Sequence, residues 1–220
     1  MNTVCIDTSS ESIAITAAGK LGLFTCIYKP ANKRHSALLI SSIEYAVKEA
    51  GFDIDQTEII VCPQGPGGFT GLRLAYSAAK AIHLKTNAKM YCIPILDAIH
   101  FNVGKNFPQS ISIIDAKRDR FYTKLFNDGI CSEAADIPAV KALELADLSK
   151  ICAVCGFGTD KFRTDLLDSG HIHVDNLVFI ELKPEILSQI MLEYICSTEK
   201  RIEIKDYDGP MYIRKSDAEE

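Results

Sequence analysis

Short apolar runs separated by polar turns open the chain, and a longer helical pattern follows them. The runs at residues 3–7, 12–17 and 21–28 have strand lengths and strand-type alternation, so they predict three strands. Residues 35–50 instead place apolar side chains every three or four positions, and Gly51 follows as a helix-ending residue. The front of the chain is therefore predicted to be an antiparallel meander followed by a helix.

The middle of the chain repeats a strand-then-helix pattern. A buried strand is expected at 59–62, a helix over 71–85 and a further short strand at 90–93. The segment 104–109 breaks this pattern and predicts a boundary between two lobes.

The second half of the chain begins as the first half does. Residues 110–126 read as an apolar strand, a polar turn and an alternating strand. In this comparison the pair Ile6-Asp7 matches the pair Ile114-Asp115. An internal repeat of this kind predicts two related lobes, and chance similarity between two hairpins is the alternative.

Two lobes are expected, at residues 1–105 and 106–220. This prediction also allows the tail, or the last clear helix at 184–196, to pack back on the first lobe. Strand hairpins that are each followed by helices predict a mixed α/β architecture, with a sheet flanked by helices in each lobe.

The turn after the strand at 59–62 is rich in glycine and proline, with the sequence PQGPGGFTG at 63–71. Thr70 is a suitable N-cap for a helix that begins at Gly71 or Leu72. The spacing fits neither the Walker A loop nor the dinucleotide fingerprint. A tight turn without a ligand is one interpretation, and backbone N–H groups aimed at an anion are the other. The candidates for nucleotide contact are Asp7, Thr8, Gly65, Gly67, Gly68, Thr70 and Arg73.

The helix at 71–85 has small or apolar residues on both of its sides. A helix of this kind is covered on both sides, either by another helix of the chain or by a partner protein. With the apolar face of the helix at 35–50, it predicts a partner interface made of Leu39, Ile43, Val47, Leu74, Ala75, Ala78, Ala81 and Ile82.

Composition narrows the classes of function. The chain has 220 residues, of which 47% are hydrophobic and 24% charged, and its net charge is −5. This acidic balance argues against direct binding of RNA by this chain alone. Apolar runs long enough to span a membrane are missing, and Asp7 and Glu11 interrupt any leader-like segment. The expected compartment is the cytoplasm.

The eight cysteines lie mostly within apolar runs, as buried free thiols do. Cys152 and Cys155 form a CxxC sequence inside a predicted strand, where side chains three positions apart face opposite ways. A metal or redox role for this pair is not expected.

Five short motifs occur in one order along the chain: IDTS at 6–9, RHSALL at 34–39, GPGGFTGLR at 65–73, IDAKRDRFY at 114–122 and PMYIR at 210–214. Together they resemble the TsaB (YeaZ) family, a bacterial branch of the Gcp-like proteins. The resemblance implies two ribonuclease-H-like lobes of the ASKHA class, to which actin and Hsp70 belong.

The same resemblance implies a function. Proteins of this family are non-catalytic subunits of the cytoplasmic complex that transfers a threonylcarbamoyl group to the adenosine beside the anticodon of tRNA. The implied partners are a TsaD-type catalytic paralogue and a TsaE-type ATPase, with a homodimer when the subunit is alone. Transfer RNA is contacted through the complex. No cofactor of its own is implied, and ATP or ADP is left to a site shared with a partner.

Some positions depart from the family pattern. The family usually has Ser where Gly68 stands, which weakens a hydroxyl contact to a ligand there. A TsaD-type paralogue holds its metal through two His residues one helical turn apart, on the helix that corresponds to 35–50. Here His35 is present but Leu39 occupies the second position, so neither a metal site nor a catalytic residue is expected.

A stand-alone ATP-dependent phosphotransferase of the ASKHA type is the alternative function. It would use Asp7, Thr8 and the glycine-rich turn. Asp7 and Asp115 would then position a metal and a nucleophile, whereas in the first interpretation they hydrogen-bond the turns that follow them. A protease is disfavoured, because no Ser–His–Asp or Cys–His signature is evident.

Overall fold

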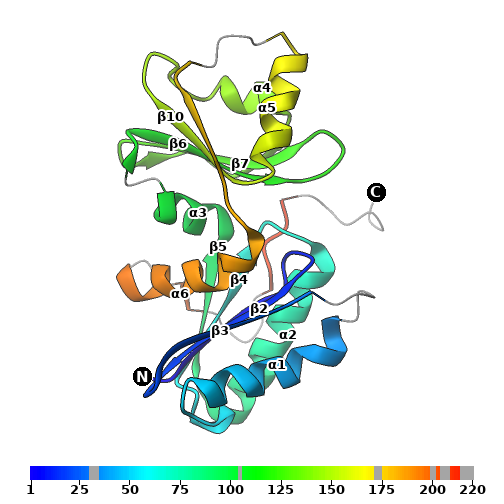
Figure 1. Cartoon of the computed structure of the whole chain (residues 1–220), viewed down its shortest axis with the longest axis vertical. Helices are drawn as coiled ribbons and strands as arrows, with labels where there is room; N and C mark the ends of the chain where they lie inside the picture. Colours follow the sequence, from blue (N-terminus) through cyan, green and yellow to red (C-terminus); the bar gives the residue numbers. More distant parts are fainter. Residues whose placement is uncertain (30–34, 104–105, 171–174, 199–201, 204–208, 214–220) are drawn as a thin grey trace. The chain divides into compact units, whose positions relative to one another are not determined.

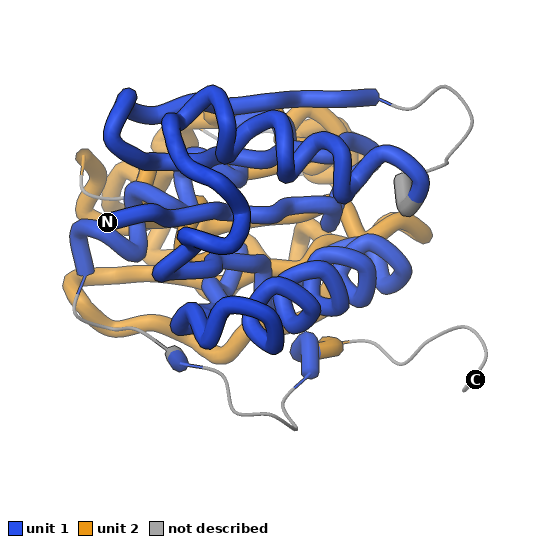
Figure 2. The backbone as a smooth tube through the Cα atoms, turned by 90° about the horizontal axis from the view of Figure 1, so that it is seen from below, with its two compact units in different colours: residues 1–95, 184–211 blue, residues 96–183, 212–220 orange. Residues whose placement is uncertain are grey.

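A computed structural model describes residues 1–29, 35–103, 106–170, 175–198, 202–203 and 209–213. The chain divides into two compact units (Figure 2). Unit 1 comprises Met1–Ile95 and Pro184–Met211, and unit 2 comprises Leu96–Lys183 and Tyr212–Glu220.

Unit 1 is built on a mixed six-stranded sheet in the order β12-β5-β4-β1-β2-β3 (Figure 1). The predicted meander is confirmed, because β1, β2 and β3 pair antiparallel, while β4 pairs parallel to both β1 and β5. The strands are β1 (Thr3–Asp7), β2 (Ile13–Gly19), β3 (Gly22–Tyr28), β4 (Ile59–Gly65), β5 (Lys89–Pro94) and β12 (Ile202–Glu203).

Helices cover both faces of this sheet. Helices α1 (His35–Glu49) and α2 (Phe69–Thr86) pack on one face, in a core that includes Val4, Ile6 and Ile15. Helix α6 (Leu187–Ser197) lies on the other face and contacts β1, β2 and β4. Two short 3-10 helices, Ile54–Gln56 and Pro184–Ile186, complete the unit.

Unit 2 repeats the arrangement with a second mixed sheet in the order β11-β10-β6-β7-β8. Here β6 and β7 form the antiparallel hairpin, and β10 pairs parallel to β6 and β11. The elements are α3 (Ile95–Val103), β6 (Gln109–Asp115), β7 (Phe121–Asn127), β8 (Ile130–Cys131), β9 (Ala135–Ile137), α4 (Ala139–Leu143), β10 (Cys152–Phe157), α5 (Thr159–Asp168) and β11 (Leu177–Glu181).

The predicted repeat and fold class are confirmed by these two sheets. In each unit a hairpin is followed by two parallel strands on the side of its first strand, so β1, β2, β4 and β5 correspond to β6, β7, β10 and β11. Helices follow the strands in both cases. The chain therefore has two α/β lobes, each with a mixed sheet flanked by helices.

The boundaries of the units differ from the lobes expected at 1–105 and 106–220. The first unit ends at Ile95, so nearly all of α3 joins the second unit. The segment Pro184–Met211, which carries α6, returns to the first unit, where α6 covers the open face of the sheet. Sequence periodicity defines elements but not the sheet against which each one packs.

Candidate functional site

The candidate site of unit 1 lies where β1 and β4 end. The loop after β1 and the glycine-rich turn after β4 are held together by two hydrogen bonds. The hydroxyl of Thr8 donates to the carbonyl of Gly71 at 2.7 Å, and the N–H of Gly68 donates to the carbonyl of Ser9 at 2.9 Å. The two segments therefore pack directly on each other, without space between their backbones at this point.

Two of the glycines are required by close backbone approach. A Cβ atom on Gly71 would lie 1.8 Å from the carbonyl oxygen of Thr8. A Cβ atom on Gly65 would lie 2.5 Å from the carbonyl oxygen of Met211, and Gly65 also has a positive φ of 118°. Only glycine fits either position. The turn thus serves contacts within the chain, which supports the interpretation of a tight turn.

Helix α2 begins earlier than expected. It starts at Phe69, and Gly68 is the N-cap with an extended backbone, so the prediction that Thr70 caps a helix from Gly71 or Leu72 is wrong. Thr70 lies exposed in the first turn of the helix. The N–H of Gly68 donates a hydrogen bond to the carbonyl of Ser9. This bond fixes the N-cap conformation at Gly68, two residues before the predicted N-cap.

The other candidates for nucleotide contact do not converge on one point. The side chain of Arg73 is directed along α2, with its guanidinium 3.9 Å from the centre of the Phe69 ring. Gly67 lies against Ser9, and Gly68 is exposed. The candidate residues therefore lie mainly on two loops that pack on each other, one at Thr8 and the other at Gly65–Gly71. Arg73 lies beside them on α2, stacked on the Phe69 ring.

Asp7 is fully buried at the end of β1. Its Oδ1 accepts a 2.9 Å hydrogen bond from the N–H of Ser9, while its Oδ2 has no partner among the described residues. Burial raises the pKa of Asp7 to about 6, although the hydrogen bonds from Ser9 oppose this shift. The carboxyl group thus holds the turn after β1, as the structural interpretation predicts.

The face of the sheet on which Asp7 lies follows from the strand register. Cys5 pairs with Thr16, and the hydroxyls of Thr16 and Ser188 are 2.8 Å apart, so this face is the one that α6 covers. Asp7 lies two residues beyond Cys5 and therefore shares its face. Asp7 therefore lies on the face of the sheet opposite α1 and α2.

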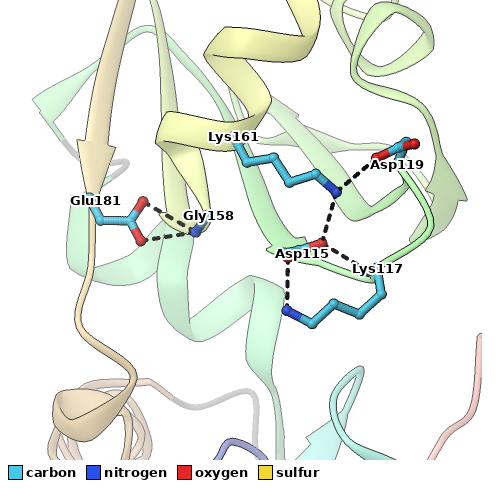
Figure 3. A network of polar contacts seen from close by, with 6 residues as sticks. All are labelled: Asp115, Lys117, Asp119, Gly158, Lys161 and Glu181. Carbon is cyan, nitrogen blue, oxygen red and sulfur yellow. Dashed lines mark hydrogen bonds and ion pairs between the residues drawn. The ribbon is translucent and has the colours of Figure 1, made fainter.

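Unit 2 has an acidic residue at the equivalent strand end, in a different setting (Figure 3). Asp115 accepts hydrogen bonds from the N–H and Nζ of Lys117 at 2.8 and 3.0 Å. Lys161 of α5 lies 3.7 Å from Asp115 and 3.2 Å from Asp119. Burial raises the pKa of Asp115, but the hydrogen bonds from Lys117 and the charges of both lysines outweigh burial and leave that pKa lowered.

Asp7 and Asp115 do not match in space as the sequence comparison suggests. Ile6 and Ile113 both belong to the cores that face the following helices. Asp115 lies two residues after Ile113 and shares its face, whereas Asp7 comes one residue after Ile6 and lies on the opposite face. The match between Ile6-Asp7 and Ile114-Asp115 is therefore corrected by one residue.

Glu181 closes the start of α5 in unit 2. Its carboxylate accepts hydrogen bonds from the N–H of Gly158 at 2.9 and 3.2 Å (Figure 3). It also accepts hydrogen bonds from the N–H and hydroxyl of Thr159, both at 2.6 Å. This end of a helix favours an anion, and here a side chain of the same unit provides it. No pattern in the sequence pointed to Glu181, because it is 22 residues from Thr159.

Comparison with known proteins adds the family to this geometry. Residues 29–198 match the model of the family described as "TsaD: tRNA N6-adenosine threonylcarbamoyltransferase". The chain belongs to this family. The match spans parts of both units, including the glycine-rich turn and α5.

Curated relatives place the chain in the TsaB/YeaZ branch of the family. The protein named "tRNA threonylcarbamoyladenosine biosynthesis protein TsaB" of Buchnera aphidicola is 26% identical over 187 residues, which is 80% of this chain and 83% of that protein. An uncharacterized protein of Mycobacterium tuberculosis is 29% identical over 124 residues. That match spans 56% of each protein, so the chain covers about half the length of the mycobacterial relative.

A solved structure confirms the fold. The crystal structure described as that of "an uncharacterized protein with similarity to peptidase YEAZ from Pseudomonas aeruginosa" superposes with a TM-score of 0.71 at 17% identity. The superposition covers 97% of this chain and 99% of the other. Among the residues that the structure describes, no helix is long and apolar enough to cross a bilayer.

The partner interface predicted for this TsaB-like chain needs correction at six positions. Leu39, Ile43, Val47, Ala75, Ala78 and Ile82 are all buried in the core of unit 1 itself. The reason is that their helical spacing directs them to the chain's own sheet. Leu74 is half-buried and packs against the edge of this core, while Ala81 is exposed on the outside of α2. Helix α1 adds Ile40, which is 49% exposed.

The helix that the resemblance matches to the metal-binding helix of a TsaD-type paralogue is α1. It begins at His35, whose side chain lies outside the described part of the structure. Leu39, one helical turn later, is 2% exposed and belongs to the core. Among the described residues, no three potential metal-ligand side chains gather in one place.

Unit 2 contains one Ser–His contact that the sequence did not reveal. The Nδ1 of His100 and the hydroxyl of Ser110 are 2.8 Å apart, and the imidazole stacks on Phe126 at a centroid distance of 3.9 Å. Ser110 has no exposed surface, so its hydroxyl is not accessible to a substrate. This contact holds α3 on β6 and β7 and gives no support to a protease.

Proposed function

We infer that this chain is a non-catalytic, cytoplasmic subunit required for threonylcarbamoyl transfer to the adenosine beside the anticodon of tRNA. In this proposal a TsaD-type paralogue carries the catalytic site and a TsaE-type ATPase is the third protein. The Buchnera relative is named for the biosynthesis of this modified nucleoside, and its match to 80% of this chain supports a role in the same process.

The observation that carries the non-catalytic assignment is the position of Leu39. In a TsaD-type protein the resemblance implies two His ligands at i and i+4 on this helix, and the metal needs both on one face. Here the second position is a leucine packed into the core of unit 1. Restoring a ligand there would require burying an unpaired polar group, which core packing disfavours.

The glycine-rich turn supports the same assignment. The Gly68 N–H, which a phosphate would need as a donor, is already donated to Ser9, and Gly71 packs on Thr8. No cofactor of this chain's own is proposed, and a nucleotide would bind at a site completed by a partner. The net charge of −5 similarly favours contact with tRNA through the complex.

The proposed docking surface for the TsaD-type paralogue is the outer side of α1 and α2. It is formed by Ile40, Leu74, Ser77 and Ala81, which are exposed or half-buried on the helices that cover one face of unit 1. Small side chains on a helix permit close helix–helix packing, and burial of apolar surface contributes about 25 cal/mol per Å². A paralogue with equivalent helices would present a similar surface of small and apolar side chains to pack against this one.

Co-purification tests this proposal. Wild-type chain and the catalytic paralogue from the same cell are co-expressed, and the complex is measured by size-exclusion chromatography with light scattering. Ala81→Glu is expected to abolish the complex while circular dichroism stays unchanged. Thr164→Glu, which adds the same charge on exposed helix α5, is the matched control and is expected to bind normally. Normal binding by Ala81→Glu would refute the docking surface.

One observation favours a second candidate, an ATP-dependent phosphotransferase of the ASKHA type. The Oδ2 atom of Asp7 is buried without a hydrogen-bond partner in the described structure, as a carboxylate that awaits a metal would be. Calorimetric titration of the isolated chain with Mg-ATP separates the two functions. The non-catalytic assignment predicts no tight binding, whereas binding and turnover that Asp7→Asn abolishes would replace it.

A further inference from the structure

Two of the five sequence motifs meet at the end of β4. Met211 belongs to the motif PMYIR at 210–214, and it contacts the start of the motif GPGGFTGLR at 65–73. The N–H of Met211 donates a 2.8 Å hydrogen bond to the carbonyl of Gln64, the residue before that glycine-rich motif. The proposed function gives the segment around Met211 no role of its own.

Gln64 lies at an irregular point of β4. The register between β4 and β5 shifts between Pro63 and Gly65, so Gln64 has no residue directly opposite it on β5. A backbone carbonyl that loses its place in a sheet needs another donor or water. The N–H of Met211 is that donor. The C-terminal segment therefore completes the end of β4.

The same contact determines the next residue of β4. The carbonyl oxygen of Met211 lies 2.5 Å from the place where a Cβ atom on Gly65 would be, and Gly65 has a φ of 118°. A side chain at position 65 would push the C-terminal segment away. Met211 thus contacts the start of the glycine-rich turn with both of its backbone polar groups.

Backbone contacts, with little burial of side chains, hold this segment in place. Met211 is 43% exposed, and Gly209 is exposed, with nothing within 4 Å of the place of its Cβ. Segments with few buried apolar contacts open locally at much lower free energy than the whole domain. Earlier in the chain, β12 pairs with Tyr91 and Cys92 of β5. This pairing keeps the segment close to unit 1 after Met211 is released.

We propose that residues 209–211 form a strap that opens and closes on the glycine-rich turn without unfolding of unit 1. In the closed form the strap fixes Gln64 and Gly65, and through them the turn that leads into α2 at Phe69. In the open form the carbonyl of Gln64 faces water. The turn is then held only from its other side, by the loop after β1.

The strap also affects the docking surface, a part of the inference that rests on the proposed function. Helix α2 begins directly after the turn and carries Leu74, Ser77 and Ala81 of that surface. A partner that binds the ordered form of a surface binds more weakly when this form is only partly populated. Because such coupling is reciprocal, a bound paralogue shifts the strap toward its closed form.

Hydrogen exchange of the full, isolated chain tests the strap. Met211→Pro removes the N–H that bonds to Gln64, and the variant is expected to exchange about fivefold faster at the hydrogen-bonded amides of Gly68 and Leu72. The amide of Val61, within β4, is expected to keep its rate. Met211→Ala retains the N–H and removes only an exposed side chain, so this matched control is expected to exchange as the wild type does.

A second variant opens the strap from the side of the turn. Gly65→Ala places a Cβ atom against the carbonyl of Met211 and is expected to speed exchange of the Met211 amide, whereas Gly209→Ala is not. Wild-type rates at Gly68 and Leu72 in Met211→Pro would overturn the proposal. Equal acceleration at Val61 would also overturn it, because the variant would then act by global unfolding.

Exchange in the presence of the catalytic paralogue tests the link to docking. The bound paralogue is expected to slow exchange of the Met211 amide in the wild-type chain. An unchanged rate in the complex would refute the link to docking. Failure of the wild type to bind the paralogue would instead refute the proposed function, and the results on the isolated chain would still decide whether the strap exists.

Discussion

The hydroxyl of Thr8 donates a 2.7 Å hydrogen bond to the carbonyl of Gly71, across the packed loops at the end of β1 and β4. This bond joins two segments 63 residues apart in the sequence. It also explains why a glycine occupies position 71, since the carbonyl of Thr8 lies where a side chain would begin. The glycine-rich turn is thus packed directly on the loop after β1.

Gly71→Ala is expected to destabilise the protein by about 2–4 kcal/mol, because its Cβ would lie 1.8 Å from the Thr8 oxygen and the backbones would have to separate. Urea denaturation followed by circular dichroism measures the change. Gly209→Ala, whose Cβ would meet nothing within 4 Å, is the control and is expected to be nearly neutral. Equal stability of the two variants would show that the loops are not packed as described.

Asp7→Asn is expected to stabilise the protein above pH 6. Burial raises the folded-state pKa of Asp7 from 3.8 to about 6. The stability that the neutral, buried Asp7 side chain gives the wild type is therefore fully present below pH 3.8. That stability is lost as pH rises through 6, because the folded protein must then bury a charged carboxylate. The asparagine has no charge to bury. At pH 8 the gain is expected to be up to about 3 kcal/mol, at about 1.4 kcal/mol per pKa unit.

The measurement for Asp7→Asn is the free energy of unfolding of wild type and variant at several pH values from 4 to 8. The difference between the two proteins is expected to be small at pH 4 and to grow up to pH 6. A difference that does not change with pH would show that the carboxyl group ionises normally in the folded state.

Glu181→Ala is expected to cost about 1–3 kcal/mol, because the N–H groups of Gly158 and Thr159 lose the acceptor that closes the start of α5. Hydrogen exchange should locate the loss, with faster exchange in the first turn of α5. Glu133→Ala removes an exposed acid from the same unit and serves as the comparison. Faster exchange in both variants alike would argue against a specific cap.

The sequence predicted most of the elements because their periodicity is strong. The helix expected at 35–50 is α1, and the hairpin and parallel strands of both lobes follow from short apolar runs with turn residues between them. The glycine-rich turn was also located correctly. Each of these features is determined by residues that lie close together in the sequence.

Other features depend on contacts between distant residues, and these were not predictable. An apolar stripe such as that of Leu39 and Ile43 shows that a helix is covered, but it does not show whether the chain's own sheet or a partner covers it. The capping of α5 by Glu181 has the same origin. The return of α6 to unit 1 was expected only as one of two arrangements, because periodicity does not show which sheet a helix covers. The one-residue offset between Asp7 and Asp115 is set by strand pairing, which a sequence match cannot define.

Ala81→Glu is expected to leave the fold intact and to prevent docking of the paralogue, since Ala81 is exposed on α2 and a buried unpaired carboxylate at an interface is costly. The affinity for the paralogue should fall at least about tenfold. Ser77→Glu, on the same exposed side, is expected to act alike, while Thr164→Glu should not. Calorimetric titration with the paralogue gives the three affinities.

The most direct test of the central claim is threonylcarbamoyl transfer to tRNA, assayed with the catalytic paralogue, the ATPase and a threonylcarbamoyl donor, with and without this chain. If the chain is a non-catalytic docking subunit, the wild type, Asp7→Asn and Thr70→Ala should restore transfer equally, and Ala81→Glu should not. Loss of transfer in Asp7→Asn, with the paralogue still bound, or full transfer with Ala81→Glu, would contradict a non-catalytic docking subunit.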